Sequence, residues 1–278
     1  MSGIKATLVK ELRERTGAGM MDCKNALEEN NGDIDVAIDW LRKQGLSEAA
    51  KKSGRIASEG LVGLRKISMK GALVEVNAET DFVARNQEFQ AFVETMADII
   101  LNQEVTINDL STVTYSNTGS TVGDVLTNMI ATIGENIQIR RATTLKVEEG
   151  VVSSYMHNSL KANLGRIGVL VALESSGDKE QLEVLGKQIA MHVAATNPIA
   201  VSRDDLDIKE LDREKNILTE QARETGRPEH ILDKIIQGRL QKYFQEVCLL
   251  EQTFVVDTER NVESAVASIA NKIGEPIQ

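Results

Sequence analysis

Apolar residues in the first 45 positions recur every three or four residues, which is the period of an amphipathic helix. Three such stripes follow one another, separated by breaks rich in glycine or asparagine. Helices this short cannot bury an apolar stripe alone, so the pattern predicts a compact three-helix bundle. The stripes are Ile4, Leu8 and Leu12; Met20, Cys23 and Leu27; and Ile34, Ala37, Ile38 and Leu41.

The ends of these helices are marked by residues that commonly cap helices. Gly17-Ala18-Gly19 is expected to end the first helix, and Asp33 is placed to cap the third. Gly45 predicts the end of the third helix. The small and basic residues of 48–58 then predict a linker.

A weak internal repeat follows this segment. Glu59-Gly60-Leu61-Val62 is echoed by Glu149-Gly150-Val151-Val152. Each copy leads to an apolar segment typical of a strand, at 72–76 and 168–173, and then to a helix with one apolar face. Two related α+β units are the economical interpretation. The apolar faces are Phe89, Phe92, Val93, Met96 and Ile100 in the first unit, and Leu182, Leu185, Ile189 and Val193 in the second.

A charged helical segment at 203–243 is interrupted at Thr225-Gly226-Arg227-Pro228, which predicts a helical hairpin inserted in the second unit. Pro228 suits the first turn of the second helix. Each helix carries a narrow apolar stripe, so the hairpin is expected to pack on another domain or chain and is a candidate surface for a homodimer. Residues 247–256 return to a β-like composition, and 262–273 predicts a final helix.

The predicted fold class is therefore α+β, and a length of 278 residues is enough for two domains. The predicted domains are residues 1–54 for the bundle and linker, 55–145 for the first core unit, 146–202 with 244–278 for the second, and 203–243 for the hairpin.

Composition makes a protein partner the better expectation. The chain carries 32 Lys plus Arg against 42 Asp plus Glu, a formal net charge of −10. One Trp, three Tyr and five Phe leave few rings on which bases can stack. Because an acidic surface also repels phosphate backbones, direct nucleic-acid binding is not expected.

The sequence also predicts a cytoplasmic protein that does not enter a membrane. Cys23 and Cys248 lie far apart and form no CxxC pair, which fits a reducing compartment. No apolar run approaches the ~20 residues that a membrane span requires. The N-terminal segment lacks the apolar core of a signal peptide, so Met1 is expected to be the mature start.

Common catalytic motifs are missing from the sequence, which contains no GxxxxGK[ST], HExxH or GxSxG. Gly17-Ala18-Gly19-Met20-Met21-Asp22 resembles the start of a dinucleotide fingerprint, but a predicted helix precedes it and Asp22 would repel a pyrophosphate. His192 lies between apolar helix residues and is expected to be a hydrogen-bonded structural histidine. Neither an enzyme nor a bound cofactor or metal is expected.

The connection between the first unit's strand and its helix reads Asn-Ala-Glu-Thr-Asp-Phe-Val-Ala-Arg-Asn over 77–86. Asn86 is a natural N-cap for the helix that follows. A helix starting at Phe82 would place Arg85 and Asn86 on the buried stripe, so Phe82 and Val83 are expected in a loop. Composition alone favours Phe82 folding back over its own sheet rather than pointing outward.

Several long motifs in order resemble the translation elongation factor Ts family, and the resemblance covers nearly the whole chain. The motifs are Leu8-Val9-Lys10-Glu11-Leu12-Arg13, Thr16-Gly17-Ala18-Gly19-Met20-Met21-Asp22-Cys23-Lys24, Thr80-Asp81-Phe82-Val83-Ala84, Ile133-Gly134-Glu135-Asn136-Ile137, His192-Val193-Ala194-Ala195 and Gln252-Thr253-Phe254-Val255.

The resemblance implies a ubiquitin-associated-like N-terminal bundle, a core of two related subdomains and a coiled-coil hairpin. It implies guanine nucleotide exchange on elongation factor Tu, in which the segment Thr80, Asp81, Phe82 and Val83 disturbs the partner's Mg²⁺ and phosphate site. Met20, Met21, Ile133, Gly134 and His157 correspond to further contacts with that partner. Phe82 is then expected to point outward.

Two departures from the family pattern are visible. Residues 158–163 lengthen the connection after His157, which affects the geometry expected for that residue. The chain also stops at Gln278, before the strand and tail with which family members usually continue, so a truncated terminus is expected.

Two other functions stay open at this point. The N-terminal bundle could capture a different partner, with the core serving as a scaffold. Alternatively, Asp81 and His157 could form an acid/base pair in an enzyme.

Overall fold

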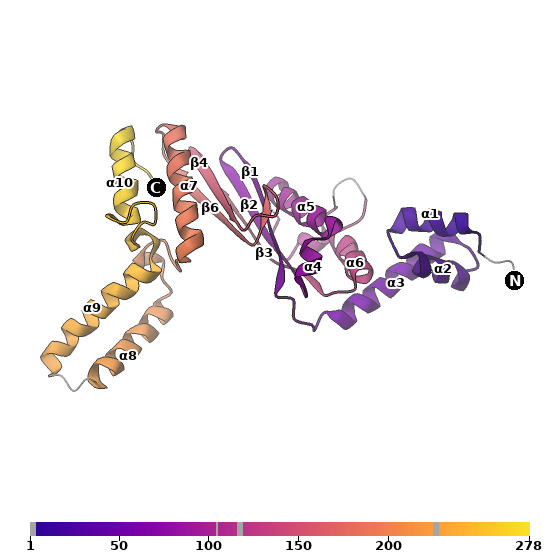
Figure 1. The fold of residues 1–278 in the computed structure, drawn as a ribbon, viewed down its shortest axis with the longest axis horizontal. Helices are drawn as coiled ribbons and strands as arrows, with labels where there is room; N and C mark the ends of the chain where they lie inside the picture. Colours follow the sequence, from indigo (N-terminus) through magenta and orange to yellow (C-terminus); the bar gives the residue numbers. More distant parts are fainter. Residues whose placement is uncertain (1–3, 104, 116–118, 225–227) are drawn as a thin grey trace. The chain divides into compact units, whose positions relative to one another are not determined.

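The computed structural model describes residues 4–103, 105–115, 119–224 and 228–278, without the side chains of residues 229 and 230. Helices and antiparallel strands are mixed along the chain, which confirms the α+β class (Figure 1). The chain divides into two compact units, 1–66 with 71–144 and 156–168, and 67–70 with 145–155 and 169–278. The finer division into four domains stays a prediction.

Three helices, α1 (Ala6–Thr16), α2 (Met20–Glu29) and α3 (Ile34–Lys52), open the first unit and pack around a small apolar core. Asp33 caps α3 as predicted, since its side chain accepts the N–H groups of Asp35 and Val36 at 3.0 and 3.1 Å. Trp40, the one tryptophan of the sequence, packs partly buried against this core. The core residues are Val9, Leu12, Cys23, Ala26, Leu27 and Ala37.

The predicted end of α3 at Gly45 is wrong, because the helix continues to Lys52 and shortens the linker. Gly45 is buried and faces α6 (Val122–Ile133), where a Cβ would lie 3.6 Å from a Thr127 methyl carbon. Arg42 also pairs with Asp124 of α6 at 2.6 Å. Packing against α6 therefore outweighs the weak helix propensity of glycine.

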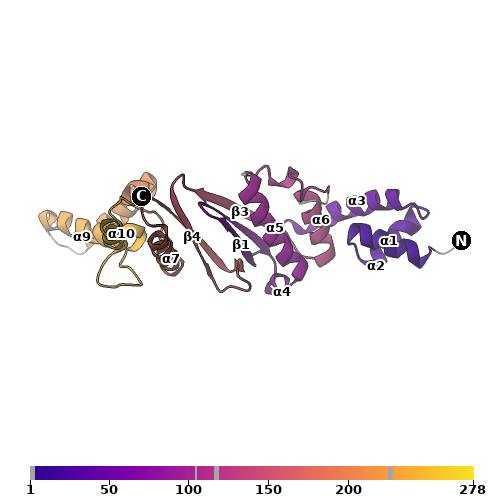
Figure 2. The ribbon, with the colours of Figure 1, turned by 90° about the horizontal axis from the view of Figure 1, so that it is seen from above.

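A four-stranded sheet forms the middle of the first unit, in the order β3-β2-β1-β5. Helices α5 (Gln87–Gln103) and α6 cover one face of this sheet (Figure 2). The predicted apolar face of α5 is fully confirmed, since Phe89, Phe92, Val93, Met96 and Ile100 are all buried. The strands are β1 (Glu59–Ile67), β2 (Lys70–Ala78), β3 (Ile137–Lys146) and β5 (Leu164–Gly165).

The second unit is built on a two-stranded sheet of β4 (Gly150–His157) and β6 (Ile167–Glu174). Helices α7 (Lys179–Thr196) and α10 (Val262–Ile273) pack on it through a shared apolar cluster. The final helix has the bounds that the sequence predicts. The backbone of Gln278 pairs with Glu174 at the end of β6, in two hydrogen bonds of 2.8 and 3.0 Å.

The two copies of the internal repeat each contain a glycine with an unusual backbone conformation. Gly60 and Gly150 have φ angles of 131° and 132°, which side chains of L-residues rarely adopt. A Cβ at Gly60 would collide with the Val76 carbonyl oxygen, and one at Gly150 with the Leu173 carbonyl oxygen. Each glycine therefore lets one strand approach its neighbour closely, at equivalent places in the two copies.

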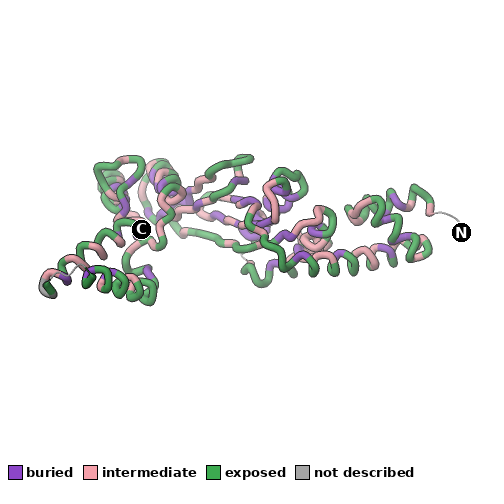
Figure 3. The backbone as a smooth tube through the Cα atoms, turned by 60° about the horizontal axis from the view of Figure 1, so that its bottom comes forward, coloured by how far each residue is buried: buried purple, intermediate pink, exposed green. Residues whose placement is uncertain are grey.

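A hairpin of α8 (Ile208–Glu224) and α9 (Glu229–Val247) lies within the second unit, its helices side by side (Figure 1). Exposed residues predominate along the hairpin (Figure 3). Pro228 is the N-cap of α9 rather than a residue of its first turn. Thr225-Gly226-Arg227, in the predicted break, lies outside the described residues.

The predicted β-like segment at 247–256 is not a strand. It contains a short 3₁₀ helix, η4 (Leu249–Glu251), and isolated bridges at Cys248 and Thr253. Its apolar residues serve other contacts: Phe254 is buried in the α7–α10 cluster and Cys248 in a cluster at the root of the hairpin. Local β-propensity therefore gave way to tertiary packing.

Arg203 joins the hairpin root to the segment that follows it. Its guanidinium lies 4.2 Å from the centre of the Phe244 ring and donates to Glu251 and, at 2.8 Å, to Gln241. The contacts connect the start of η3 (Arg203–Asp205), the end of α9 and η4.

Candidate functional site

The segment Thr80–Val83 forms a short helical turn at the end of β2. Helix α4 (Asp81–Ala84) is closed by the Arg85 N–H donating to the Phe82 carbonyl at 3.1 Å and the Asn86 N–H donating to the Val83 carbonyl at 2.9 Å. The chain then starts a new helix, α5, because the Asn86 side chain accepts the N–H groups of Glu88 and Phe89 at 2.8 and 3.2 Å. The predicted N-cap is confirmed.

The prediction that Phe82 and Val83 lie in a loop is wrong. It rested on one continuous helix from Phe82 into α5, which would bury Arg85 and Asn86. The break at Asn86 resets the helical phase, so a separate turn places Val83 and Ala84 inward without burying either polar residue. Both Arg85 and Asn86 are exposed.

Phe82 is 75% exposed, whereas the other four phenylalanines of the sequence are between 0% and 7% exposed. The composition-based expectation of an inward ring is therefore wrong, and the outward ring implied by the family resemblance is what the structure has. The ring of Phe82 is therefore free of the core to which its neighbour Val83 belongs.

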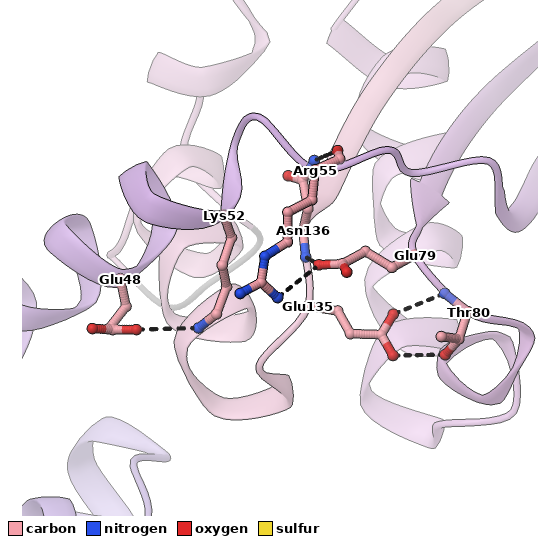
Figure 4. A network of polar contacts seen from close by, with 7 residues as sticks. All are labelled: Glu48, Lys52, Arg55, Glu79, Thr80, Glu135 and Asn136. Carbon is pink, nitrogen blue, oxygen red and sulfur yellow. Dashed lines mark hydrogen bonds and ion pairs between the residues drawn. The ribbon is translucent and has the colours of Figure 1, made fainter.

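Glu135 anchors the N-terminal end of the turn. Its carboxylate accepts the Thr80 N–H at 2.9 Å and the Thr80 hydroxyl at 2.6 Å (Figure 4). Thr80 is the N-cap residue of α4, yet its side chain makes no capping hydrogen bond to the turn. The hydroxyl is instead committed to Glu135, 55 residues away along the chain.

Asn136 adds a second layer of hydrogen bonds beside this anchor. Its backbone N–H donates to Glu79 at 2.6 Å, and its side-chain amide donates to the Arg55 carbonyl at 2.7 Å (Figure 4). Arg55 also pairs with Glu79 at 3.5 Å. Asn136 is only 2% exposed, so these bonds fix the position of the residue next to Glu135.

A buried glutamine holds the other end of the turn. The Gln90 side-chain amide donates to the Ala84 carbonyl at 2.9 Å, and Gln90 is 6% exposed. Asp81 is half-exposed and pairs with Arg85 at 3.6 Å. The turn is thus fixed at Thr80 and at Ala84, and Phe82 projects from between these points.

Ile133 and Gly134 are brought next to this turn by the chain itself. They end α6, where Gly134 has a φ of 85° and its N–H donates to the Ile130 carbonyl at 3.0 Å. Glu135, which follows directly, reaches Thr80. The structure therefore joins two motifs that are 50 residues apart in the sequence.

Met20 and Met21 are the first residues of α2, in the three-helix bundle. They are 61% and 63% exposed. Adjacent helix positions cannot both face inward, which predicts that one of the pair is exposed. Both are exposed, and the buried stripe of α2 contains Cys23 and Leu27 without Met20.

His157 ends β4 and is exposed. Its carbonyl accepts the Arg166 N–H at 3.2 Å. The longer connection at 158–163 folds back on itself, with Asn158 at a φ of 48° and Lys161 bridged to Leu164. The insertion is thereby accommodated in a turn between β4 and β5.

His192, by contrast, is a fully buried residue of α7. Its Nδ1 accepts the Val255 N–H at 3.2 Å, so Nε2 carries the proton and donates to Gln252 at 2.8 Å. Burial lowers the pKa of the ring, and the bond to Gln252 offsets this only in part. The structural role predicted for His192 is confirmed.

In the part of the chain that the structure describes, no three His, Cys, Asp or Glu side chains are grouped so that they could hold a metal ion. Within those same residues, no helix is long and apolar enough to cross a bilayer.

The sequence profile of a family described as "Elongation factor TS" matches residues 79–277, a stretch that begins at the anchored turn. This chain belongs to the elongation factor Ts family. The elongation factor Ts of Rhodospirillum centenum is 54% identical over 278 residues, which cover 100% of this chain and 91% of that protein. The family's role is in translation elongation, a step of protein biosynthesis.

Two further elongation factor Ts proteins are similar along the whole chain. That of Paramagnetospirillum magneticum is 52% identical over 278 residues, covering 100% of this chain and 89% of the relative. That of Rhodospirillum rubrum is 53% identical over 279 residues, covering 100% of this chain and 90% of the relative.

Sequence reasoning missed Glu135 and Gln90 as parts of the site. Glu135 directly follows Ile133-Gly134 in a motif of the elongation factor Ts family, so its position was visible but its contact was not. Gln90 is a polar residue beside Phe89 on the apolar face of α5, which is a signal for a buried hydrogen bond.

Proposed function

We propose that this chain is a guanine nucleotide exchange factor for elongation factor Tu and is not itself an enzyme. It binds the GDP-bound partner in the cytoplasm and promotes GDP release by disturbing the partner's Mg²⁺ and phosphate site. The observation that carries the proposal is Phe82, which stands 75% exposed on a turn fixed at both ends.

Phe82 acts as a wedge in this mechanism. A GTPase holds its nucleotide largely through Mg²⁺ and backbone donors around the phosphates, so displacing those groups weakens the ligand without contact to the base. An aromatic ring inserted next to them achieves this displacement. Because binding free energies are reciprocal, bound nucleotide weakens the exchange factor by the same factor.

One ring is too small to provide the whole effect. Burying a phenylalanine contributes about 1.5–3 kcal/mol, which corresponds to roughly a ten- to hundredfold change in affinity. Further contacts must therefore contribute, and we assign them to Thr80 and Asp81 of the turn, while Val83, which is 4% exposed, holds the turn to the core. Outside the turn, the assigned contacts are Met20, Met21, Ile133, Gly134 and His157.

The direct test is the release of fluorescent GDP from purified elongation factor Tu, with and without this chain. Addition of the chain in catalytic amounts is expected to accelerate release. Phe82→Ala should reduce the acceleration at least about tenfold without lowering the melting temperature. Ile67→Ala, which also truncates an exposed apolar side chain (62% exposed), is the matched control and should leave the rate unchanged.

Unchanged GDP release with the wild-type chain would disprove the proposed function. If Phe82→Ala accelerated release as fast as the wild-type chain, the exchange function would stand, but the role proposed for the Phe82 ring would be disproved.

A second candidate function rests on the exposed methionine pair at the start of α2. If the ubiquitin-associated-like bundle alone captures a partner and the core is a scaffold, Met20→Ala with Met21→Ala abolishes binding while the wild-type chain leaves GDP release unchanged. Under the proposed exchange function, the same double variant weakens binding to elongation factor Tu but still accelerates release at saturating concentrations.

A further inference from the structure

We infer that Glu135 is a positioning residue for the exchange reaction, which acts by holding the Phe82 turn in its outward conformation. The inference rests on the proposed function, because it concerns the same site. Glu135 directly follows Gly134, which we assign to the partner contacts. Its carboxylate reaches the turn through two hydrogen bonds, both from Thr80.

Helix α4 cannot be stable on its own. A helix of four residues fixes several backbone dihedrals in return for very few hydrogen bonds, so nucleation is unfavourable. Two side chains from other elements supply what is missing. Glu135 holds the start of the turn at Thr80, and Gln90 holds its end at Ala84.

The two hydrogen bonds at Thr80 are of a strong type. Hydrogen bonds to an ionised carboxylate are among the stronger ones in proteins, and here one carboxylate accepts two from a single residue. The N–H bond fixes the backbone where α4 starts. The hydroxyl bond fixes χ1 of Thr80, so the residue preceding Asp81 and Phe82 has no freedom to rotate.

Glu135 is itself held in place by the residues on either side of it. It lies between Gly134, whose backbone ends α6, and Asn136, whose two hydrogen bonds reach Glu79 and Arg55. Glu79 directly precedes Thr80. The segments 79–80 and 135–136 are therefore joined by reciprocal bonds, each accepting a backbone N–H of the other (Figure 4).

The test compares Glu135→Ala with Glu135→Gln in fluorescent GDP release from elongation factor Tu. Alanine removes both bonds and is expected to lower the release rate at saturating exchange factor about tenfold. Glutamine keeps an oxygen for the Thr80 N–H and offers an amide to the Thr80 hydroxyl oxygen. Its rate should stay within about twofold of wild type.

Thr80→Val provides an independent variant, since it removes the hydroxyl and keeps the backbone N–H. We expect about a threefold loss of the saturated rate. Thr80→Val combined with Glu135→Ala should be no slower than Glu135→Ala alone, because Glu135→Ala already removes the hydroxyl bond that Thr80→Val removes.

Asp124→Ala is the matched control at the other end of α6. Asp124 accepts the N–H and the hydroxyl of Thr121 at 3.3 and 2.8 Å and also pairs with Arg42 at 2.6 Å. The variant therefore loses the same kinds of bond, and one ion pair in addition, without contact to α4. A similar or larger drop in melting temperature, with an unchanged saturated release rate, is expected. General destabilisation would slow release in both variants.

Hydrogen exchange of the free chain tests the positioning without the partner. The peptide covering residues 80–86 should exchange at least about tenfold faster in Glu135→Ala than in wild type, and at the wild-type rate in Asp124→Ala. Unchanged exchange in this peptide, or full GDP release activity of Glu135→Ala, would overturn the inference. The proposed function is tested separately by the wild-type chain and Phe82→Ala. If the wild-type chain accelerates release and Phe82→Ala does not, either of these results would disprove the role of Glu135 and leave the proposed function standing.

Discussion

Neighbouring residues of the anchored turn have opposite environments. Val83 is 4% exposed and belongs to the core of the first unit, whereas Phe82 is 75% exposed. Their difference follows from the single helical turn, which points successive side chains about 100° apart. Val83 holds the turn to the core, and Phe82 remains available for a partner.

We therefore expect truncations of these two residues to separate stability from activity. Val83→Ala should lower the free energy of unfolding by roughly 1–3 kcal/mol, because it leaves a cavity in a packed core. Phe82→Ala should change it by less than about 0.5 kcal/mol, since exposed side chains contribute little. Urea denaturation of both variants measures this difference, and equal destabilisation would contradict it.

His192 makes the stability depend on pH. Its folded-state pKa lies below the unfolded value near 6.5, because the ring is buried and the hydrogen bond to Gln252 offsets this only in part. Below pH 6.5, His192 binds a proton in the unfolded chain but stays neutral in the folded chain until the pH reaches its lower folded-state pKa. Stability contributed by the neutral ring is thus present above that pH and is lost as the pH falls toward the folded pKa.

We expect the free energy of unfolding to fall between pH 7 and 5.5, with His192 contributing at most about 1.4 kcal/mol per pH unit. His192→Gln should be less stable at pH 7 but should show a shallower loss over this interval. Parallel pH curves for the two proteins would show that His192 does not cause the dependence. The carboxylates are the same in both, so their contribution cancels.

At the scale of elements, Gly60 and Gly150 connect the internal repeat to its structural cause. Both combine an unfavourable φ with a close approach to a neighbouring carbonyl. A Glu-Gly dipeptide recurs in the sequence because only glycine fits at this point of each strand.

Gly60→Ala should destabilise the protein by roughly 3 kcal/mol or more, since alanine would be strained and would collide with the Val76 carbonyl. Gly54→Ala is the matched control, because a Cβ there meets nothing within 4 Å. Thermal unfolding of the two variants tests this, and similar melting temperatures would refute the close approach.

Gly45 provides a test of the continuous helix α3. Alanine should stabilise the protein by about 1 kcal/mol, because it has the higher helix propensity and its Cβ would make ordinary contacts with Thr127 and Ala131. A helix that stopped at Gly45 in a left-handed conformation would instead be destabilised by the same substitution. The sign of the change in melting temperature distinguishes the two.

Elements with a clear apolar period could be predicted from the sequence, and those set by tertiary contacts could not. The face of α5 and the bounds of α10 follow from periodicity and capping. The continuation of α3 depends on α6, and the irregular path of 247–256 depends on burying Phe254 and Cys248. Neither set of packing contacts can be recognised from the local sequence pattern.

The same limit applies to the site. The segment Thr80–Val83 was singled out from its sequence, but its outward ring followed only from the family resemblance. Its anchor, Glu135, lies 55 residues from Thr80, and the pairing depends on how α6 ends against β2. The structure exposes Met20, Met21 and His157. Their contact with a partner stays a prediction.

On the scale of the whole molecule, each compact unit contains one buried cysteine. Cys23 lies in the core of the three-helix bundle, and Cys248 lies at the root of the hairpin. Burial raises the pKa of both thiols, so neither is a reactive thiolate near neutral pH. Each thiol becomes accessible only when its own surroundings open.

Leu12→Ala should therefore speed the labelling of Cys23 by a thiol reagent roughly a hundredfold, because Leu12 shares the bundle core. Labelling of Cys248, in the other unit, should not change. Leu12→Ala combined with Cys248→Ala gives the labelling rate of Cys23, and Leu12→Ala combined with Cys23→Ala gives that of Cys248. Equal acceleration at both thiols would mean that the units open together.

Trp40 packs against the bundle core on α3, and the sequence contains no other tryptophan. Excitation near 295 nm therefore selects light emitted from one place in the bundle, with no label attached. With a partner that has no tryptophan, a change in the emission maximum on mixing would report on the surroundings of Trp40 in the first three helices. The Phe82 ring that we propose to displace nucleotide is silent at that wavelength.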